Sequence, residues 1–285
     1  MKRDSMIFRL LEYYGTHFNH RGKWWVHSRL RKFLGADINE EIETSREGLR
    51  WVLSPGDHVQ ADLFWYGSKD MWDVYHLKSF LKPRSTLFDI GANFGYYSLT
   101  MARILGKDCQ IFAFEPTPSI FDRFRKHISL NFMEDVIHAH GIGLSNVEKE
   151  EKICVVEENT GASYIEPGAT EGVDISLSTL DGFCSKNNVG KIDFIKIDTE
   201  GFETFVLEGG KATIAKDKPV ILIELNPSCL IRAGSSLQDV LGFFKSNDYG
   251  LYHAKRDKLL PLLDLPHEGD YANAFCIPNS LRIEA

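Results

Sequence analysis

From Pro83 onward, short apolar runs alternate with amphipathic stretches of helical length. This alternation is typical of a parallel β-sheet covered by helices on both faces. We therefore expect an α/β fold with a seven-stranded, mostly parallel sheet. Strands are predicted near 86–90, 110–115, 135–140, 192–198, 219–225, 249–254 and 272–278. Helices are predicted near 94–105, 117–131, 178–188, 203–215 and 236–247.

The pattern divides the chain into an N-terminal extension, 1–82, and a main domain, 83–285. Within the main domain, residues 150–177 hold two apolar segments around a glycine-rich middle, which we interpret as an inserted hairpin. In the extension, helical spacing of apolar residues over 1–35 predicts a helical arm. Two short strands, 49–53 and 58–64, are predicted to form a hairpin, and a helix over 70–81 ends before Pro83.

Composition places the chain among ordinary globular proteins. Of its 285 residues 43% are hydrophobic and 26% are charged, close to the averages for such proteins. No apolar run approaches the length of a spanning helix, and the N-terminus lacks the apolar stretch of a secretory signal. The five cysteines are widely spaced, which is typical of reduced thiols, so we expect a cytoplasmic protein.

Charge is distributed unevenly. The formal net charge of −7 argues against nucleic acid as a partner. Residues 1–35 hold eight Lys and Arg against two acids, a net +6, which leaves −13 on the remainder. This basic, aromatic-rich arm is interpreted as a packing or self-association element, or as a peripheral contact to an anionic membrane.

A glycine loop follows the first predicted strand of the main domain. Thr86 to Ile90 form a buried-strand pattern, Gly91-Ala92-Asn93-Phe94-Gly95 follows directly, and a helical stretch begins at Tyr96. Glycine lets the backbone turn tightly and approach a ligand closely. A strand, glycine turn and helix in this order predict a ligand cradle.

Three details narrow the ligand. Asn93 occupies the position where a dinucleotide-binding loop has the glycine that makes room for a pyrophosphate, so a nucleoside without pyrophosphate fits better. Glu115 ends the second strand about twenty residues after the loop, where an acid accepts ribose hydroxyls. Asp89 ends the first strand and is a candidate to hold a ligand ammonium, directly or through water.

With these residues the chain resembles the FkbM family of S-adenosylmethionine-dependent methyltransferases, which implies a Rossmann-like class I methyltransferase fold. The resemblance covers roughly 80–280 and does not extend to 1–60. It rests on the segments Asp89 to Ser98, Phe114-Glu115-Pro116, Ser178 to Asp181, Ile192 to Glu203 and Pro219 to Glu224.

The resemblance implies methyl transfer to an oxygen, often a hydroxyl of a sugar or secondary metabolite, so the expected partner is a small-molecule or glycan acceptor. It places the methionine part of the cofactor near the glycine loop, the ribose at Glu115 and the adenine at the end of the third strand, 140–145. The cofactor-binding residues expected on this basis are Asp89, Gly91, Ala92, Asn93, Gly95, Ser98, Glu115, Pro116, Gly141, Ile142 and Asp198.

Acidic residues follow two neighbouring strands. Methylation of an alcohol requires a positioned acceptor and removal of its proton. Asp198 and Glu200 follow the strand ending at Ile197, and Glu224 lies near the end of the next. Mutual repulsion in such a group raises a carboxyl pKa, so these three are the catalytic candidates, with Asp198 or Glu200 preferred as base.

Other interpretations of this block remain open. Asp198, Glu224 and Asn226 offer oxygen ligands of the kind that Mg²⁺ prefers, although a metal-free route is favoured. Lys196 is interpreted as a snorkelling side chain or an ion-pair partner, and Glu203 as an acid favoured by the N-terminus of a helix. The alternatives to a methyltransferase are a nucleotide-sugar or dinucleotide-dependent Rossmann enzyme and a non-catalytic cofactor-binding scaffold.

Two weaker signals complete the set. His138 and His140 share one face of a predicted strand and are interpreted as structural. His140 is a secondary candidate for the general base. All five tryptophans precede the glycine loop; they are interpreted as the core of the N-terminal extension rather than as a wall that stacks on sugars.

Overall fold

The computed structural model describes residues 5–18, 20–36, 40–156, 159–166 and 168–281. The chain divides into two compact units. The smaller comprises Met1–Met71 and Val156–Ala162, and the larger comprises Trp72–Val155 and Ser163–Ala285. No helix in these described ranges is both long and apolar enough to cross a membrane.

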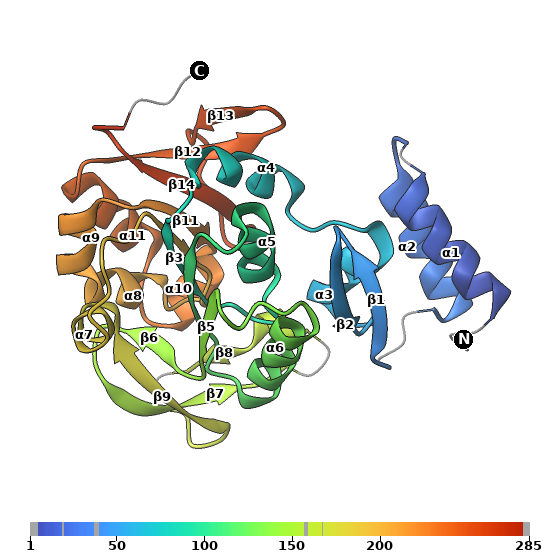
Figure 1. The fold of residues 1–285 in the computed structure, drawn as a ribbon, viewed down its shortest axis with the longest axis horizontal. Helices are drawn as coiled ribbons and strands as arrows, with labels where there is room; N and C mark the ends of the chain where they lie inside the picture. The colour runs from blue at the N-terminus through green and yellow to red at the C-terminus, as the bar shows by residue number, and fades with distance from the viewer. Residues whose placement is uncertain (1–4, 19, 37–39, 157–158, 167, 282–285) are drawn as a thin grey trace. The chain divides into compact units, whose positions relative to one another are not determined.

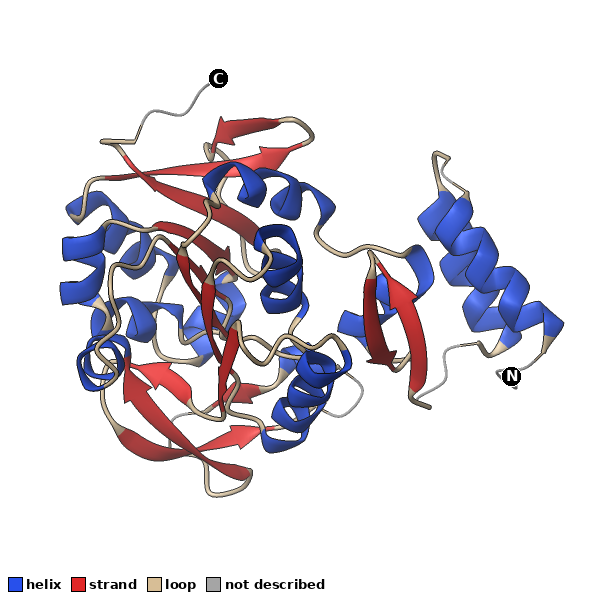
Figure 2. Cartoon of the chain, in the orientation of Figure 1, coloured by secondary structure: helices blue, strands red, loops and turns tan. Residues whose placement is uncertain are grey.

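An eight-stranded sheet forms the centre of the larger unit (Figures 1 and 2), in the order β13-β12-β14-β11-β10-β3-β4-β5. Its strands are β3 (Thr86–Ile90), β4 (Gln110–Phe114), β5 (Ile137–His140), β10 (Phe194–Ile197), β11 (Val220–Leu225), β12 (Tyr249–Lys255), β13 (Lys258–Pro261) and β14 (Ala272–Pro278). Strands β11 to β5 are mutually parallel, and β14 is antiparallel to β11.

This order is that of a Rossmann-like class I methyltransferase fold, with one strand more than the seven predicted. All seven predicted strands are present. The additional strand, β13, is a four-residue edge strand antiparallel to β12. Its residues are exposed or half-buried, so the sequence shows no buried-strand pattern there.

Helices cover both faces of the sheet, as expected for this fold (Figure 1). On one face lie α4 (Met71–Phe80), α5 (Tyr96–Leu105) and α6 (Pro118–Leu130); Phe80 of α4 packs on Phe275 of β14. On the other lie α7 (Leu180–Lys186), α8 (Glu203–Gly209), α9 (Lys211–Asp217), α10 (Pro227–Arg232) and α11 (Leu237–Ser246). Their apolar residues form one buried core with the sheet.

Two features of this second face differ from prediction. The single helix predicted over 203–215 is two helices, α8 and α9, separated at Gly209-Gly210, because glycine is unfavourable inside a helix. Helix α10 was not predicted, although Asn226 followed by Pro227 is a recognisable N-terminal signal.

The inserted segment is a four-stranded sheet rather than a simple hairpin. Its strands β6 (Gly143–Ser145), β7 (Lys149–Cys154), β8 (Tyr164–Ile165) and β9 (Val173–Thr179) lie in the order β6-β9-β7-β8. The predicted hairpin corresponds to the antiparallel pair β7 and β9. Strand β6 pairs parallel with β9, and β8 pairs with the end of β7.

The smaller unit contains α1 (Met6–His17), α2 (Lys23–Leu34), β1 (Ile42–Arg46), β2 (Leu49–Leu53), α3 (His58–Tyr66) and the 3₁₀ turn η1 (Thr160–Ala162). The predicted helical arm is confirmed as α1 and α2; its residues 1–4 and 19 lie outside the described ranges. Trp51, Phe64 and Trp65 are fully buried and form the centre of this unit's core.

The hairpin predicted in this unit was wrong in its pairing. Strand β2 pairs with β1, through a turn whose Glu47 and Gly48 both have left-handed backbone. The predicted strand over 58–64 is helix α3. Asp57 caps it, because its carboxylate accepts the backbone N–H groups of Val59 and Gln60.

Candidate cofactor and acid site

The glycine loop and the acidic block meet at the carboxyl ends of β3 and β10. Chain order reverses between these two strands, since β4 follows on one side of β3 and β10 lies on the other. Open α/β sheets bind ligands at this switch point. The backbone N–H of Asp198 donates to the Ile90 carbonyl (3.1 Å), which joins the two strand ends.

The glycines of the loop are required by its geometry. Gly91 has a φ of 76° and Gly95 a φ of 92°, a region that side chains other than glycine rarely adopt. A Cβ atom on Gly91 would overlap the Asp198 carbonyl oxygen, and one on Gly95 would overlap the Phe124 ring. The loop therefore approaches both the acidic block and α6 as closely as a backbone can.

Asn93 stabilises the turn itself. It has left-handed backbone with a φ of 51°, which Asn tolerates better than most residues. Its side-chain oxygen accepts the N–H of Phe94 (2.7 Å). Its own N–H donates to Oε2 of Glu115 (3.0 Å).

Glu115, the predicted ribose ligand, is buried behind the loop. Besides the Asn93 bond, its Oε1 accepts the N–H of Thr117 (2.9 Å), so this carboxylate joins the glycine loop to the start of α6. Burial raises the pKa of Glu115. The Thr117 side chain also hydrogen-bonds to this carboxylate. An ionised carboxylate has about four lone-pair sites, so it can still accept a hydroxyl. Pro116 follows it directly, and Gly141 and Ile142 follow β5 at the same edge of the sheet.

Asp89 is fully buried at the end of β3. Its Oδ2 accepts both the N–H (3.0 Å) and the hydroxyl (2.6 Å) of Ser98 on α5. Its Oδ1 has no hydrogen-bond partner among the described residues. Burial raises the pKa of Asp89, opposed chiefly by the Lys196 ammonium.

Lys196 is an ion-pair partner, one of the two interpretations its position allowed. Its Nζ donates to the carbonyl of Gly91 (2.8 Å) and lies 3.2 Å from Oδ2 of Asp198 and 3.8 Å from Oδ1 of Asp89. It also lies over the Tyr97 ring, 5.4 Å from the ring centroid. This one buried cation thus links the glycine loop to the acidic block, a role missing from the sequence-derived set of site residues.

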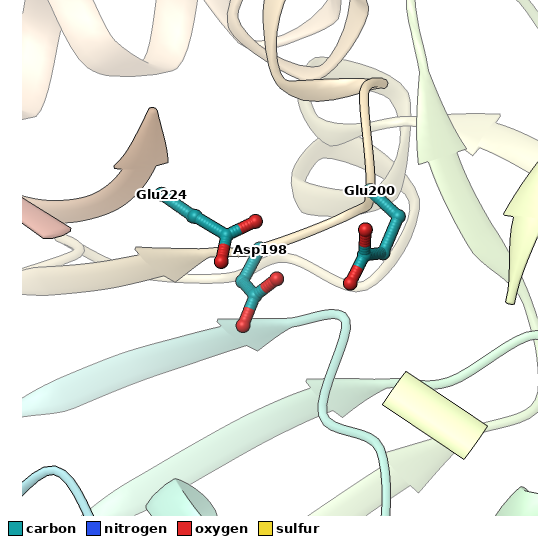
Figure 3. A group of neighbouring side chains, drawn as sticks. All are labelled: Asp198, Glu200 and Glu224. Carbon is teal, nitrogen blue, oxygen red and sulfur yellow. The ribbon is translucent and has the colours of Figure 1, made fainter. Parts of the chain in front are cut away.

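The three predicted catalytic acids converge in space. Figure 3 shows the carboxyl groups of Asp198, Glu200 and Glu224 turned toward one another, and one oxygen of each lies within 4.8 Å of the others. Asp198 and Glu200 come from the loop after β10, and Glu224 from β11. The expectation that neighbouring strand ends bring these side chains together is therefore correct in geometry.

Glu200 is held with its carboxyl group among other acids. Its backbone is left-handed, with a φ of 53°. The Cys229 thiol donates to its Oε2 (3.3 Å), and Arg232 donates to its backbone carbonyl (3.1 Å). Burial and the neighbouring Asp198 raise the pKa of Glu200 to about 7.

Glu224 carries the largest perturbation in the group. Burial, followed by repulsion from Asp198 and Glu200, raises its pKa well above its ordinary value. Its Oε2 is buried without a hydrogen-bond partner among the described residues. The raised pKa favours the protonated form of Glu224 at a pH where an ordinary glutamate is ionised.

Glu203 has a structural role larger than that of a helix-terminal acid. Its Oε1 accepts the N–H (2.8 Å) and hydroxyl (2.9 Å) of Thr199 and the N–H of Gly201 (3.2 Å). It thereby fixes the loop that carries Glu200. Burial raises the pKa of Glu203.

The metal alternative fits this geometry only in part. The three carboxylates offer hard oxygen ligands. The Asn226 side-chain oxygen, however, accepts the N–H of Cys229 (3.3 Å) as the cap of α10. Lys196 already places a cation beside Asp198.

The weaker candidates have packing roles. His138 and His140 both pack on Phe112, and His140 also packs on Phe114 and Phe183; burial lowers the pKa of His140. Among the tryptophans, Trp51 and Trp65 are buried in the smaller unit's core, whereas Trp24, Trp25 and Trp72 are exposed. The core interpretation therefore holds for two of the five.

Known proteins with similar sequences are methyltransferases. A protein named hexuronic acid methyltransferase AglP, from Haloferax volcanii, is 29% identical over 125 residues, covering 43% of this chain and 48% of that protein. A protein named 2-O-methyltransferase NoeI, from Sinorhizobium fredii, is 25% identical over 151 residues, covering 48% and 62%. The chain thus spans about half to three fifths of the length of these relatives.

Structural similarity and a family model complete the comparison. A crystal structure of methyltransferase FkbM from Methylobacillus flagellatus is similar with a TM-score of 0.43 and 18% identity, covering 94% of this chain and 58% of that one. A TM-score of this size adds nothing to the assignment. The family model described as "Methyltransferase FkbM domain" matches residues 89–251, more than half of the chain. The chain therefore belongs to the FkbM methyltransferase family.

Proposed function

We propose that the protein is an S-adenosylmethionine-dependent O-methyltransferase in which Glu200 removes the proton of an acceptor hydroxyl. The observation that carries this proposal is the convergence of three carboxyl groups beside the glycine loop. Within that group, Glu200 has a pKa of about 7. A general base is most effective when its pKa lies near the working pH.

The residues present fit the proposed cofactor. Asp89 offers a buried oxygen without a hydrogen-bond partner in the described part of the chain, suited to an ammonium group. The loop at Gly91, Asn93 and Gly95 offers a close backbone approach without the glycine that a pyrophosphate requires, and Glu115 offers lone pairs to ribose hydroxyls. Ala92, Ser98, Pro116, Gly141, Ile142 and Asp198 complete the proposed contacts.

S-adenosylmethionine supplies a methyl group that its sulfonium already activates, so the protein's own task is to orient the acceptor and take its proton. Glu200 accepts that proton on its carboxylate. Glu224, whose pKa burial raises well above its ordinary value, donates a hydrogen bond to the acceptor in its protonated form. Asp198 holds Lys196, which in turn fixes the carbonyl of Gly91.

For the acceptor we propose a hydroxyl of a glycan or of a small metabolite. The names of two relatives, a hexuronic acid methyltransferase and a 2-O-methyltransferase, support an oxygen acceptor on a carbohydrate. The group of three acids favours an acceptor without negative charge next to the reacting hydroxyl, because a further carboxylate there would be repelled.

Two measurements test this function. Calorimetric titration of the full chain with S-adenosylmethionine and with NAD identifies the cofactor, and binding of NAD alone would point to a dinucleotide enzyme. Transfer of radiolabelled methyl groups to a panel of glycans and metabolites then tests catalysis. If S-adenosylmethionine binds and Glu200→Gln leaves every detected transfer unchanged, Glu200 is not the base.

A further inference from the structure

Helix α1 has apolar side chains on two opposite sides. Phe8 and Leu11 are buried, and Phe8 packs on Trp65 of α3 with ring centroids 5.0 Å apart. On the opposite side, Met6, Leu10 and Tyr13 are 75%, 56% and 54% exposed. Their spacing of four and three residues places them in one stripe along the helix.

Helix α2, which lies beside α1 (Figure 1), also has one buried side and one exposed apolar side. Its Lys23 and His27 are buried against α1, where they contact the carbonyls of Gly15 and Leu11. Its outward side carries Trp25, 61% exposed, and Phe33, 86% exposed. Arg29 lies between them at helical spacing, with its guanidinium 4.3 Å from the Trp25 ring centroid.

The helix pair formed by α1 and α2 is strongly basic. The described residues from 5 to 36 include six Lys and Arg and a single acid, Glu12, and that acid is paired with Arg46. We name the outward sides of the two helices the basic aromatic face: Met6, Leu10 and Tyr13 of α1, with Trp25, Arg29, Lys32 and Phe33 of α2.

The geometry points to a peripheral binding site for an anionic lipid bilayer on the basic aromatic face. Surface-lying helices bind membranes with Trp, Phe and Leu inserted at the headgroup level and Lys and Arg paired with lipid phosphates or carboxylates. Aromatic rings flanked by cations meet both requirements. Arg29 keeps its charge in water while its stem covers Trp25.

A second copy of the chain fits this face less well. A two-fold dimer brings the same patch of both subunits together, so Arg29 and Lys32 of one copy would face the same cations of the other. Anionic headgroups instead neutralise this charge. The site is independent of the proposed catalytic function, since none of its residues belongs to the cofactor and acid site.

The test is co-sedimentation of the full chain with vesicles of phosphatidylcholine alone and with about 30% phosphatidylserine. We expect binding only to the anionic vesicles, weakened as salt rises. Arg29→Gln with Lys32→Gln is expected to weaken it about fivefold for each charge removed. Trp25→Ser with Phe33→Ser is expected to weaken it at least tenfold. The control Leu263→Ser, at an 84% exposed leucine of the larger unit, leaves binding unchanged.

Thermal unfolding of each variant checks that the fold is intact. We expect it to be intact, because the replaced side chains are exposed. The proposal fails if the wild-type chain does not sediment with anionic vesicles, or if the Trp25 and Phe33 variant binds as well as the Leu263 control. Light scattering of the chain without lipid tests the alternative, self-association through this face. Concentration-dependent dimers that dissociate on Phe33→Ser would assign this face to self-association instead.

Discussion

The catalytic proposal depends on one side chain, Glu200, as the base. Replacement with Gln keeps the size and removes the base, so we expect kcat to fall by about 10² to 10⁴. In the wild-type enzyme, activity rises with pH through about 7, because only the carboxylate accepts a proton and its pKa is raised to about 7. Initial rates between pH 5.5 and 9 measure both effects.

The matched control for this variant is Glu268→Gln, since Glu268 is exposed on the same unit. We expect it to keep the wild-type rate and pH profile. Persistence of the rise near pH 7 in Glu200→Gln would assign that titration to another group and contradict the proposed role.

Among the residues of the site, Lys196 is the one whose replacement is expected to lower the free energy of unfolding most. Lys196→Met removes the cation that faces Asp89 and Asp198 and the bond to the Gly91 carbonyl. Breaking a buried ion pair by removing one partner costs about 3 to 5 kcal/mol. Urea unfolding at pH 8 should show this loss. The loss should be smaller at lower pH, because burial raises the pKa of Asp89 and this carboxylate takes up a proton.

Lys196→Arg is the comparison, since it keeps the charge while changing the geometry. An equal unfolding free energy of Lys196→Met and the wild type at pH 8 would show that the pair contributes no stability. The sequence alone left this residue between two interpretations, because a lysine in a strand reveals nothing about which carbonyl or carboxylate lies beside it.

Chelation separates the base from the metal alternative. Because the Lys196 ammonium already lies 3.2 Å from Asp198, we expect treatment with EDTA followed by dialysis to leave methyl transfer at the untreated rate. Activity lost on chelation and restored by Mg²⁺, but not by Na⁺ at equal ionic strength, would instead establish the three carboxylates as metal ligands.

At the scale of elements, the glycine loop provides the sharpest comparison. Gly91 and Gly106 both have positive φ, 76° and 69°, but only at Gly91 would a Cβ meet other atoms, the Asp198 carbonyl among them. Gly106 has φ 69° and ψ −142°, a backbone conformation that is nearly restricted to glycine and costs another residue about 1 to 3 kcal/mol. We expect Gly106→Ala to lose about that much stability, and Gly91→Ala to lose clearly more.

Gly91→Ala is also expected to weaken S-adenosylmethionine binding at least tenfold, because the overlap displaces either the loop or the strand end that carries Asp198. Urea unfolding and calorimetry of both variants measure this. Similar losses of stability and affinity in Gly91→Ala and Gly106→Ala would mean that the loop rearranges at little cost. Its close approach to Asp198 would then have no special role.

The elements that the sequence predicted well are short apolar runs bounded by turn residues. The strands at 86–90 and 220–225 are such runs in the main sheet and were placed within a residue or two. Helix α3 was mispredicted because it lacks helical periodicity: Gln60, Ala61, Leu63, Phe64, Trp65 and Tyr66 are all buried, so the helix has no polar face. Its apolar pattern then resembles alternation, and only the capping by Asp57 distinguishes it.

At the scale of the molecule, the site's acids followed from topology, whereas their protonation did not. Parallel order alone brings the ends of β10 and β11 together, so the proximity of Asp198 and Glu224 was predictable. The pKa of each group depends on burial and on contacts such as that between Cys229 and Glu200. These contacts come from helix α10, which was not predicted.

Burial around this one site has a consequence for the whole chain's stability. It raises the pKa of Asp89, Glu115, Glu200, Glu203 and Glu224. An acid whose folded pKa lies above its unfolded value binds more protons in the native state, so stability falls as pH rises from the unfolded pKa through the folded one. We expect the unfolding free energy to decrease from about pH 5 to pH 8.

The shift of Glu200 from 4.5 to about 7 corresponds to at most about 3 kcal/mol of that decrease. His140, whose pKa is lowered by burial, acts in the opposite direction only below its ordinary pKa of 6.5. Glu224→Gln removes one raised carboxyl, so it should stabilise the chain by about 1 to 3 kcal/mol at pH 8 and hardly at pH 5. Urea unfolding at both pH values measures this difference. A gain in unfolding free energy of equal size at pH 5 and pH 8 would show that packing, and not the buried charge, is responsible.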